Sequence, residues 1–470
     1  MTNSNKSYKK DSYLTLFIQA VKGDTKDFTT GSIDKAIFLL AIPMILEMVL
    51  ESFFAVVDIY FVNKVGIEAS STVILTEASL TILYSVAWGL SIGVTALVAR
   101  RAGEKNFKAA SDIAVQSILI GTFLSLIISI IGLIFPKEIL LLMGATVKVA
   151  EENYLFTQIM LTGNIVIVLL FINNAVFRGA GNASLAMKAL LLANGINIVL
   201  DPLLILGIGP FPKMGVAGAA VATTIGRSCA VLFQFYYLFN GKALVKLARK
   251  QFVVKLGLMK SILNTSAGGM FQFIIGSCSW IFLAMIIAES GTAAVSGYGT
   301  AIRICIFTIL PAWGLANAAA TLVGQNLGAN QAERAEKSVW RTAFLTFCFF
   351  AVVSVIFLVF GKNLMLFFIQ DPEAVKAGTL CLQVLAIGYV FFAYGMIISQ
   401  AFNGAGDTKT PTYINLFVFW LLQIPLAYAL AKYLKMGPVG VYIAIGVSET
   451  ALAIVSIIVF RKGKWKLVKV

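Results

Sequence analysis

Twelve apolar segments, each more than 20 residues long, recur along the chain and restrict it to a membrane-embedded helical fold. About 20 apolar residues in a helix span the roughly 30 Å of hydrocarbon in a bilayer. Only 13% of the residues are charged, against about a quarter in soluble domains. We expect spans at 36–62, 70–99, 110–135, 153–177, 184–207, 214–239, 256–288, 293–323, 339–361, 377–402, 411–433 and 437–460. The sequence therefore predicts an all-α polytopic membrane protein with twelve transmembrane helices.

The second half of the chain repeats the first at an offset of 225 residues. Trp88-Gly89-Leu90 matches Trp313-Gly314-Leu315, and Phe177-Arg-Gly-Ala-Gly181 matches Phe402-Asn-Gly-Ala-Gly406. Six spans per repeat mean that both repeats enter the membrane from the same side. Parallel repeats of this kind are typical of transporters that bind their substrate between two lobes.

The repeats predict two pseudo-symmetric six-helix bundles, at 36–239 and 256–460, joined by a basic linker at 240–255. Most of the 37 Lys and Arg residues lie in the first segment (1–35), the basic tail (461–470) and the alternate loops between them. By the positive-inside rule both termini are expected in the cytoplasm. No signal peptide or other targeting segment is visible, which favours a prokaryotic inner (plasma) membrane.

Several function classes are excluded by composition. The net charge of +15 resides in loops between spans, so a nucleic-acid partner is not expected. The five cysteines lie in apolar segments without disulfide or metal spacing, and the absence of histidine leaves any proton relay to carboxylates. The glycine-rich turns Gly179-Ala-Gly181 and Gly404-Ala-Gly406 lack a Walker lysine pattern. We expect a monomer that is not an enzyme and uses no cofactor or nucleotide, with transport driven by an ion gradient.

Three carboxylates form a stripe on one face of the first span: Glu47, Glu51 and Asp58 fall within roughly 40° of one another at helical spacing. One charged group near a bilayer centre costs about 2.5–3.5 kcal/mol on insertion scales. The positions 225 residues later hold Gln272, Gly276 and Leu283, so the acids belong to the first lobe alone. Their restriction to one repeat suggests cation chemistry, because acids required by the fold should occur in both.

Further side chains with oxygen atoms that could bind a cation lie on the fifth and sixth spans. Asn197 and Asp201 share one helix face, and Thr223 lies at similar depth to Asn197. With Asp58, all four belong to the outer half of the lobe and carry oxygens suited to Na⁺ or protons. We predict a cation- or proton-binding site, tentatively for Na⁺, at Asp58, Asn197, Asp201 and Thr223. The alternatives are interhelical hydrogen bonds for Asn197 and Thr223, a helix cap for Asp201, and an ordinary interface residue for Asp58.

Glu47 and Glu51 lie deeper and are candidates for binding a cationic substrate or relaying protons; the alternative is a buried ion pair. Arg227 lies at the depth of Glu51, and we hypothesise that these two pair. In the second lobe Arg303 and Glu449 are also buried charges, and the sequence leaves open whether they pair.

At this point the chain resembles the multidrug and toxic compound extrusion (MATE) family over nearly its full length. The resemblance rests on Ala41-Ile-Pro43, Val57-Asp58, Arg178-Gly-Ala-Gly-Asn182, Asn197-Ile-Val-Leu-Asp201-Pro202, Gly215-Val-Ala-Gly-Ala-Ala-Val-Ala-Thr223, Val323-Gly-Gln-Asn-Leu-Gly328, Asn403-Gly-Ala-Gly-Asp-Thr408 and Gly463-Lys-Trp465. It implies export by alternating access with Na⁺ or H⁺ antiport, and a first-lobe cation site at the four residues named above.

The chain departs from the family at Glu51, where relatives commonly have glutamine, and at Glu47. The tenth span lacks the acid that some branches use, which places the chain nearer the DinF-like or archaeal type than the NorM type. The function predicted is a secondary active exporter of cationic or amphipathic organic compounds. The alternatives are a lipid-linked oligosaccharide flippase of the wider superfamily and a non-transporting membrane scaffold.

Overall fold

The computed structural model describes residues 13–23 and 27–468, and this part of the chain contains helices but no strand. Within these described residues, twelve helical segments are long and apolar enough to cross a membrane, which confirms the predicted fold class. Those of the first half are α2 (Ile33–Asn63), α3 (Ile67–Gly103), α4 (Phe107–Ile134), α6 (Val147–Thr162) continued by α7 (Asn164–Ala180), α8 (Ala183–Leu206) and α9 (Val216–Phe239). Those of the second half are α10 (Leu256–Ala288), α11 (Thr292–Gly328), α12 (Ala332–Phe368), α13 (Pro372–Ala405), α14 to η3 (Lys409–Tyr433) and α16 (Pro438–Arg461).

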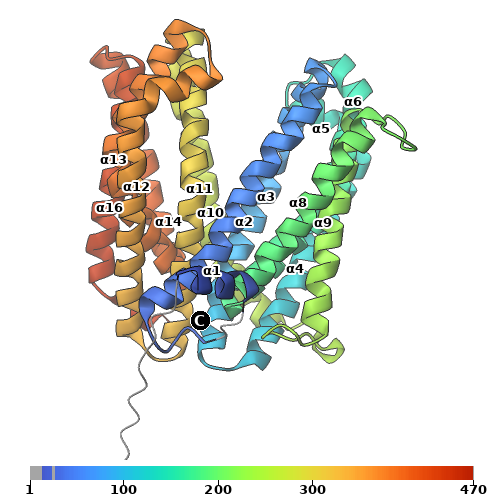
Figure 1. Ribbon diagram of the computed structural model, residues 1–470, viewed down its shortest axis with the longest axis vertical. Coiled ribbons are helices and arrows are strands. Elements are labelled where there is room, and N and C mark those ends of the chain that lie inside the picture. Colours follow the sequence, from blue (N-terminus) through green and yellow to red (C-terminus); the bar gives the residue numbers. More distant parts are fainter. Residues whose placement is uncertain (1–12, 24–26, 469–470) are drawn as a thin grey trace, which may run out of the picture.

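The helices form two groups that diverge from a common end (Figure 1). Helices of the first half, drawn in blue to green, lie on one side, and those of the second half, in yellow to red, on the other. The short helix α1 (Tyr13–Lys22) and the C-terminus lie at the end where the groups meet, which we call the terminal end. Each group has its own buried apolar cluster, built mainly from residues 62–247 in the first lobe and 283–465 in the second.

The contact between the lobes follows the internal repeat of the sequence. α10 packs on α3, and α2 packs on α11, so the first helix of each lobe contacts the second helix of the other. A β-carbon at Gly89 would lie 2.7 Å from the Met270 backbone nitrogen, and one at Gly314 would lie 2.6 Å from the Ile45 nitrogen. Gly314 and Met270 are the 225-offset counterparts of Gly89 and Ile45. Glycine is therefore required twice, once on each side of a pseudo-two-fold interface.

Hydrogen bonds close the terminal end. Gln325 Nε2 of α11 donates to the Gly179 carbonyl of α7 at 2.9 Å, and Arg100 Nη2 of α3 donates to the Val468 carbonyl at 2.7 Å. Arg334 of α12 donates to the carbonyls of Thr30 and Gly31, just before α2. Each of these bonds joins a first-half segment to a second-half segment, so the lobes are fastened at this end.

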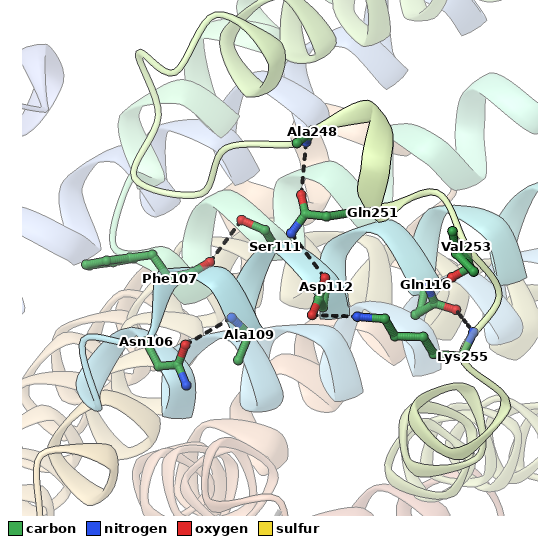
Figure 2. Close-up of polar contacts among 10 residues, drawn as sticks. All are labelled: Asn106, Phe107, Ala109, Ser111, Asp112, Gln116, Ala248, Gln251, Val253 and Lys255. Atoms are coloured by element: carbon green, nitrogen blue, oxygen red, sulfur yellow. Dashed lines mark hydrogen bonds and ion pairs between the residues drawn. The ribbon is translucent and has the colours of Figure 1, made fainter.

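The linker between the lobes is held by the first lobe (Figure 2). Lys255 Nζ lies 2.7 Å from Asp112 Oδ2, and Gln251 Nε2 donates to Asp112 Oδ1 at 3.1 Å. The Gln116 side chain of α4 accepts from the Lys255 nitrogen at 2.9 Å and donates to the Val253 carbonyl at 2.8 Å. The chain is thus fixed to α4 up to Lys255, and free movement between the lobes can begin only at α10.

Replacing Asp112 by alanine removes both side-chain contacts of the linker to this carboxylate and should release residues 240–255. We expect trypsin to cleave the purified protein at the linker lysines and arginines roughly fivefold faster or more, because lost hydrogen bonds raise the population of the open linker. Glu104→Ala is the control, since Glu104 makes an exposed ion pair with Arg101 at the adjacent end of α3. Equal cleavage rates in the two variants would show that Asp112 does not hold the linker against α4.

Candidate cation-binding site

Three of the four residues predicted to bind a cation form one hydrogen-bonded group between α8 and α9. With the Asn197 amide oxygen directed at Thr223, that oxygen accepts from Thr223 Oγ1 at 3.1 Å and from the Thr223 backbone nitrogen at 3.0 Å. Asn197 Nδ2 then donates to Asp201 Oδ2 at 2.7 Å. All three side chains are buried. Pro202 lies inside α8 and lacks an N–H, so the carbonyl of Ile198, in the same helical turn, has no helical donor.

The fourth residue, Asp58, approaches the group from α2. Its carboxylate interacts electrostatically with Asp201, and its Oδ1 atom is buried without a hydrogen-bond partner. In the part of the chain that the structure describes, no hydrogen bond joins Asp58 to Asn197, Asp201 or Thr223. Two neighbouring carboxylates cannot both stay ionised in a low-dielectric interior without a positive counterion, so the pair demands a proton or a cation.

The donor set suits a small monovalent cation better than a tightly held metal. No cluster of three or more Asp, Glu, Cys or His side chains that could hold a metal ion occurs among the described residues. Two carboxylates with amide, hydroxyl and carbonyl oxygens are instead hard ligands of low total charge. The residues present therefore fit Na⁺ as well as protons.

Arg227 of α9 is the positive charge in this region. Its Nη2 atom lies 3.9 Å from Glu51 Oε1, so the hypothesised pair is confirmed, at a length where the attraction is weak. The same guanidinium interacts with Asp58 and Tyr84. It also interacts with Glu77 of α3, an acid near Asp58 that sequence reasoning missed. The signal for Glu77 was available, because it is an acid within a predicted span whose 225-offset counterpart is Ile302.

Glu47 belongs to a separate network nearer the terminal end. Its Oε1 atom lies 2.9 Å from Arg178 Nη1 and accepts from Asn174 Nδ2 at 3.1 Å. Arg178 also donates to Ser91 Oγ at 2.8 Å, and Gln234 donates to Asn174 at 2.7 Å. Glu47 therefore forms a buried ion pair, which was the alternative to a role in substrate binding or proton relay. Its partner Arg178 directly precedes the glycine-rich turn Gly179-Ala-Gly181.

The second lobe repeats this contact without charge. Gln272 and Asn403, the 225-offset counterparts of Glu47 and Arg178, exchange hydrogen bonds of 3.0 and 3.1 Å between their amides. The fold thus requires a polar contact at this place in both lobes, and only the first lobe makes it with ions. Asp58 and Asp201 differ from Glu47 because the second lobe holds no acid at their places: Leu283 replaces Asp58, and near Pro425 the same two spans are joined by the neutral Ser279–Gln423 hydrogen bond of 2.8 Å.

Arg303 and Glu449 do not form an ion pair. Both line one cavity of the second lobe, but no contact within 4 Å joins them in residues 27–468. Arg303 is exposed, whereas Glu449 is buried.

The fold agrees with comparisons to known proteins. A family model described as MatE matches residues 43–203 and 270–429. The chain is similar to "Probable multidrug resistance protein NorM" of Thermotoga maritima, with 26% identity over 92% of this chain and 93% of the relative. It is also similar to "FAD transporter" of Shewanella oneidensis, with 24% identity over 92% and 95% of the two chains. A solved structure described as "Outward-facing conformation of a multidrug resistance MATE family transporter of the MOP superfamily" matches with a TM-score of 0.87 and 27% identity, covering 94% of this chain and 98% of that chain.

The two lobes suggest a matched test of the Glu47–Arg178 pair. Glu47→Gln leaves a buried guanidinium without its counterion and should lower the melting temperature in detergent by about 5 °C or more. The double variant Glu47→Gln with Arg178→Asn copies the Gln272–Asn403 contact and should recover most of the loss. Arg341→Gln is the control, because its exposed pair with Asp34 contributes little. If the double variant is as unstable as Glu47→Gln alone, a neutral contact cannot replace the ion pair, and the prediction is wrong.

Proposed function

The chain belongs to the MatE family of membrane transporters, and on this premise we propose that it is a secondary active exporter of cationic or amphipathic organic compounds, driven by inward movement of Na⁺ or H⁺. The observation that carries the proposal is the Asp58–Asp201 pair with Asn197 and Thr223. The two carboxylates lie in the protein interior beside amide and hydroxyl groups, and the protein does not supply one cation for each of them. They therefore need an exchangeable positive charge.

Coupling requires that the ion binds one conformation more tightly than another. Helix α2 meets this requirement, because it carries Asp58 and also packs on α11 of the other lobe around Gly314. A cation or proton that draws Asp58 toward Asp201 changes how α2 lies on the first lobe. Because the same helix forms part of the interface, that change alters the relative stability of the open and closed arrangements of the lobes.

The direction of transport follows from the charge distribution and the closed end. If the basic segments are cytoplasmic, the terminal end faces the cytoplasm and the lobes diverge toward the outside. The similarity to a solved outward-facing transporter supports this assignment. We propose a monomer in a prokaryotic inner membrane, with both termini in the cytoplasm and substrate released outward from the state described.

Asp58→Asn removes one of the two carboxylates and should reduce ion-driven efflux at least about tenfold while leaving the amount of protein in the membrane unchanged. The measurement is drug resistance and fluorescent-substrate efflux in cells that express each variant at equal level. Glu68→Gln is the control, because Glu68 is an exposed acid near the start of α3 that pairs with Lys148. Normal resistance in the Asp58→Asn cells would rule out coupling through this residue.

Flux in proteoliposomes identifies the ion and separates the alternatives. Addition of an organic cation should stimulate Na⁺ or H⁺ movement, and Asp201→Asn should abolish that stimulation, because Arg227 can then balance the one remaining carboxylate, Asp58, without a mobile ion. A scaffold would show no flux in either protein. A flippase would move a lipid-linked sugar without responding to organic cations.

A further inference from the structure

The second lobe contains a cavity of about 660 Å³ between α10, α11, α13, the π-helix η2 (Leu416–Gln423) and α16. Its volume lies within the 300–1,000 Å³ that small-molecule sites commonly occupy. The walls are mainly apolar and aromatic, with Phe273, Trp280, Trp313, Phe392 and Phe419. Polar groups are few, and two of them, Ser279 and Gln423, bond to each other at 2.8 Å. Such a cavity suits a lipophilic molecule more than an inorganic ion, which would need several free oxygen ligands.

Glu449, in the middle of α16, lines this cavity with an uncompensated acid. The residue is only 7% exposed, and its Oε2 atom is buried without a hydrogen-bond partner. The side chains that interact with it electrostatically are Cys305, Cys381 and Tyr389, none of which carries a positive charge. Arg303 lines the same cavity but is exposed and forms no ion pair with it. A buried acid without a partner in an apolar site lowers the stability of the fold, so we infer that Glu449 serves to bind a ligand.

The helix opposite Glu449 is modified where it meets the cavity. The eleventh span changes to a π-helix over Leu416–Gln423, and Phe419 and Gln423 of that segment line the cavity. The same span is π-helical again at Ala429–Tyr433, which does not line the cavity. π-helical segments within α-helices are frequent at functional sites. In the first lobe the equivalent span, α8, remains an α-helix and carries Asn197 and Asp201. The same span therefore differs between the lobes: in the first it carries the residues proposed to bind an ion, and in the second it lines a cavity large enough for an organic molecule.

A route to the cavity leads from the space between the lobes. A second cavity of about 280 Å³ lies against Trp88 of α3 and shares Trp280, Trp313 and Phe419 with the first. Trp88 and Trp313 contact each other across the interface, with ring centroids 5.7 Å apart. A molecule that enters between the lobes can thus reach Glu449 past aromatic walls.

We propose that this second-lobe cavity is the binding site for the charged end of a lipophilic organic cation, with Glu449 as its counterion and the Trp280, Trp313 and Phe419 rings against its apolar groups. Aromatic faces attract organic cations, and the attraction strengthens when both are removed from water. The inference rests on the proposed function and deepens it: the first lobe binds the coupling ion, and the second lobe selects positively charged substrates.

Binding to the purified wild-type protein and its variants tests this directly. The probes are tetraphenylphosphonium, whose charge is permanent, and triphenylphosphine oxide, a neutral compound with similar rings. Glu449→Gln should weaken tetraphenylphosphonium binding roughly tenfold or more and leave binding of the neutral compound within about twofold. Glu289→Gln is the matched control, since Glu289 is an exposed acid of the same lobe that pairs with Lys432 outside the cavity.

Each outcome decides the inference. Unchanged cation binding in Glu449→Gln, or equal loss of both probes in a variant that elutes as wild type on size exclusion, would overturn it. If Glu449→Gln does not fold, Glu449→Asp and Trp280→Leu replace it; both should weaken cation binding more than neutral binding, and equal effects would overturn the site. These measurements need no ion gradient, so wild-type protein that binds the cation but shows no coupled flux would reject the proposed exporter while leaving the site intact.

Discussion

The structure depends on one constraint: a charge inside a bilayer must have a counterion, a proton or water. The protein supplies the counterion where a charge serves the fold, as in the 2.9 Å contact between Glu47 and Arg178. Around Arg227 it supplies less than is needed, because one guanidinium faces Glu51, Asp58 and Glu77. Asp58 shares one guanidinium with two other acids, and Asp201 and Glu449 form no ion pair within the described residues. We propose that a mobile positive charge stabilises the molecule at these places.

The internal repeat separates what packing requires from what function requires. Gly89 and Gly314 are both glycine because helices approach at the same distance on each side of the interface. The Glu47–Arg178 and Gln272–Asn403 contacts occupy the same place, so a polar contact there belongs to the fold whatever its charge. Asp58 and Asp201 have no acidic equivalent in the second lobe, and the first-lobe counterpart of Glu449, at the 222-residue offset that relates Gly215 to Gly437, is the base Arg227. The unmatched acids are therefore the better indicators of function.

Mechanical coupling between the sites follows from the way the helices are shared. α2 carries Asp58 and also forms the interface with α11, while α11 carries Trp313 beside the second-lobe cavity. The linker is fixed to α4 as far as Lys255, and α10 begins at the next residue, so the first lobe holds the start of the second. An ion in one lobe and an organic cation in the other can thus bias the same interface, which is the condition for linked binding.

The sequence by itself determined the twelve spans, the doubling and the residue types of the proposed cation site, because apolar length, repeat offset and helical spacing are local properties of the chain. It also placed Arg227 at the depth of Glu51. It could not identify Arg178 as the partner of Glu47, the approach of Glu77 to Asp58, or the isolation of Glu449 from Arg303. Those depend on how helices far apart in the chain are rotated against one another. Depth can be counted along a helix, but the partner of a buried charge is decided only by which faces the packed lobes turn together.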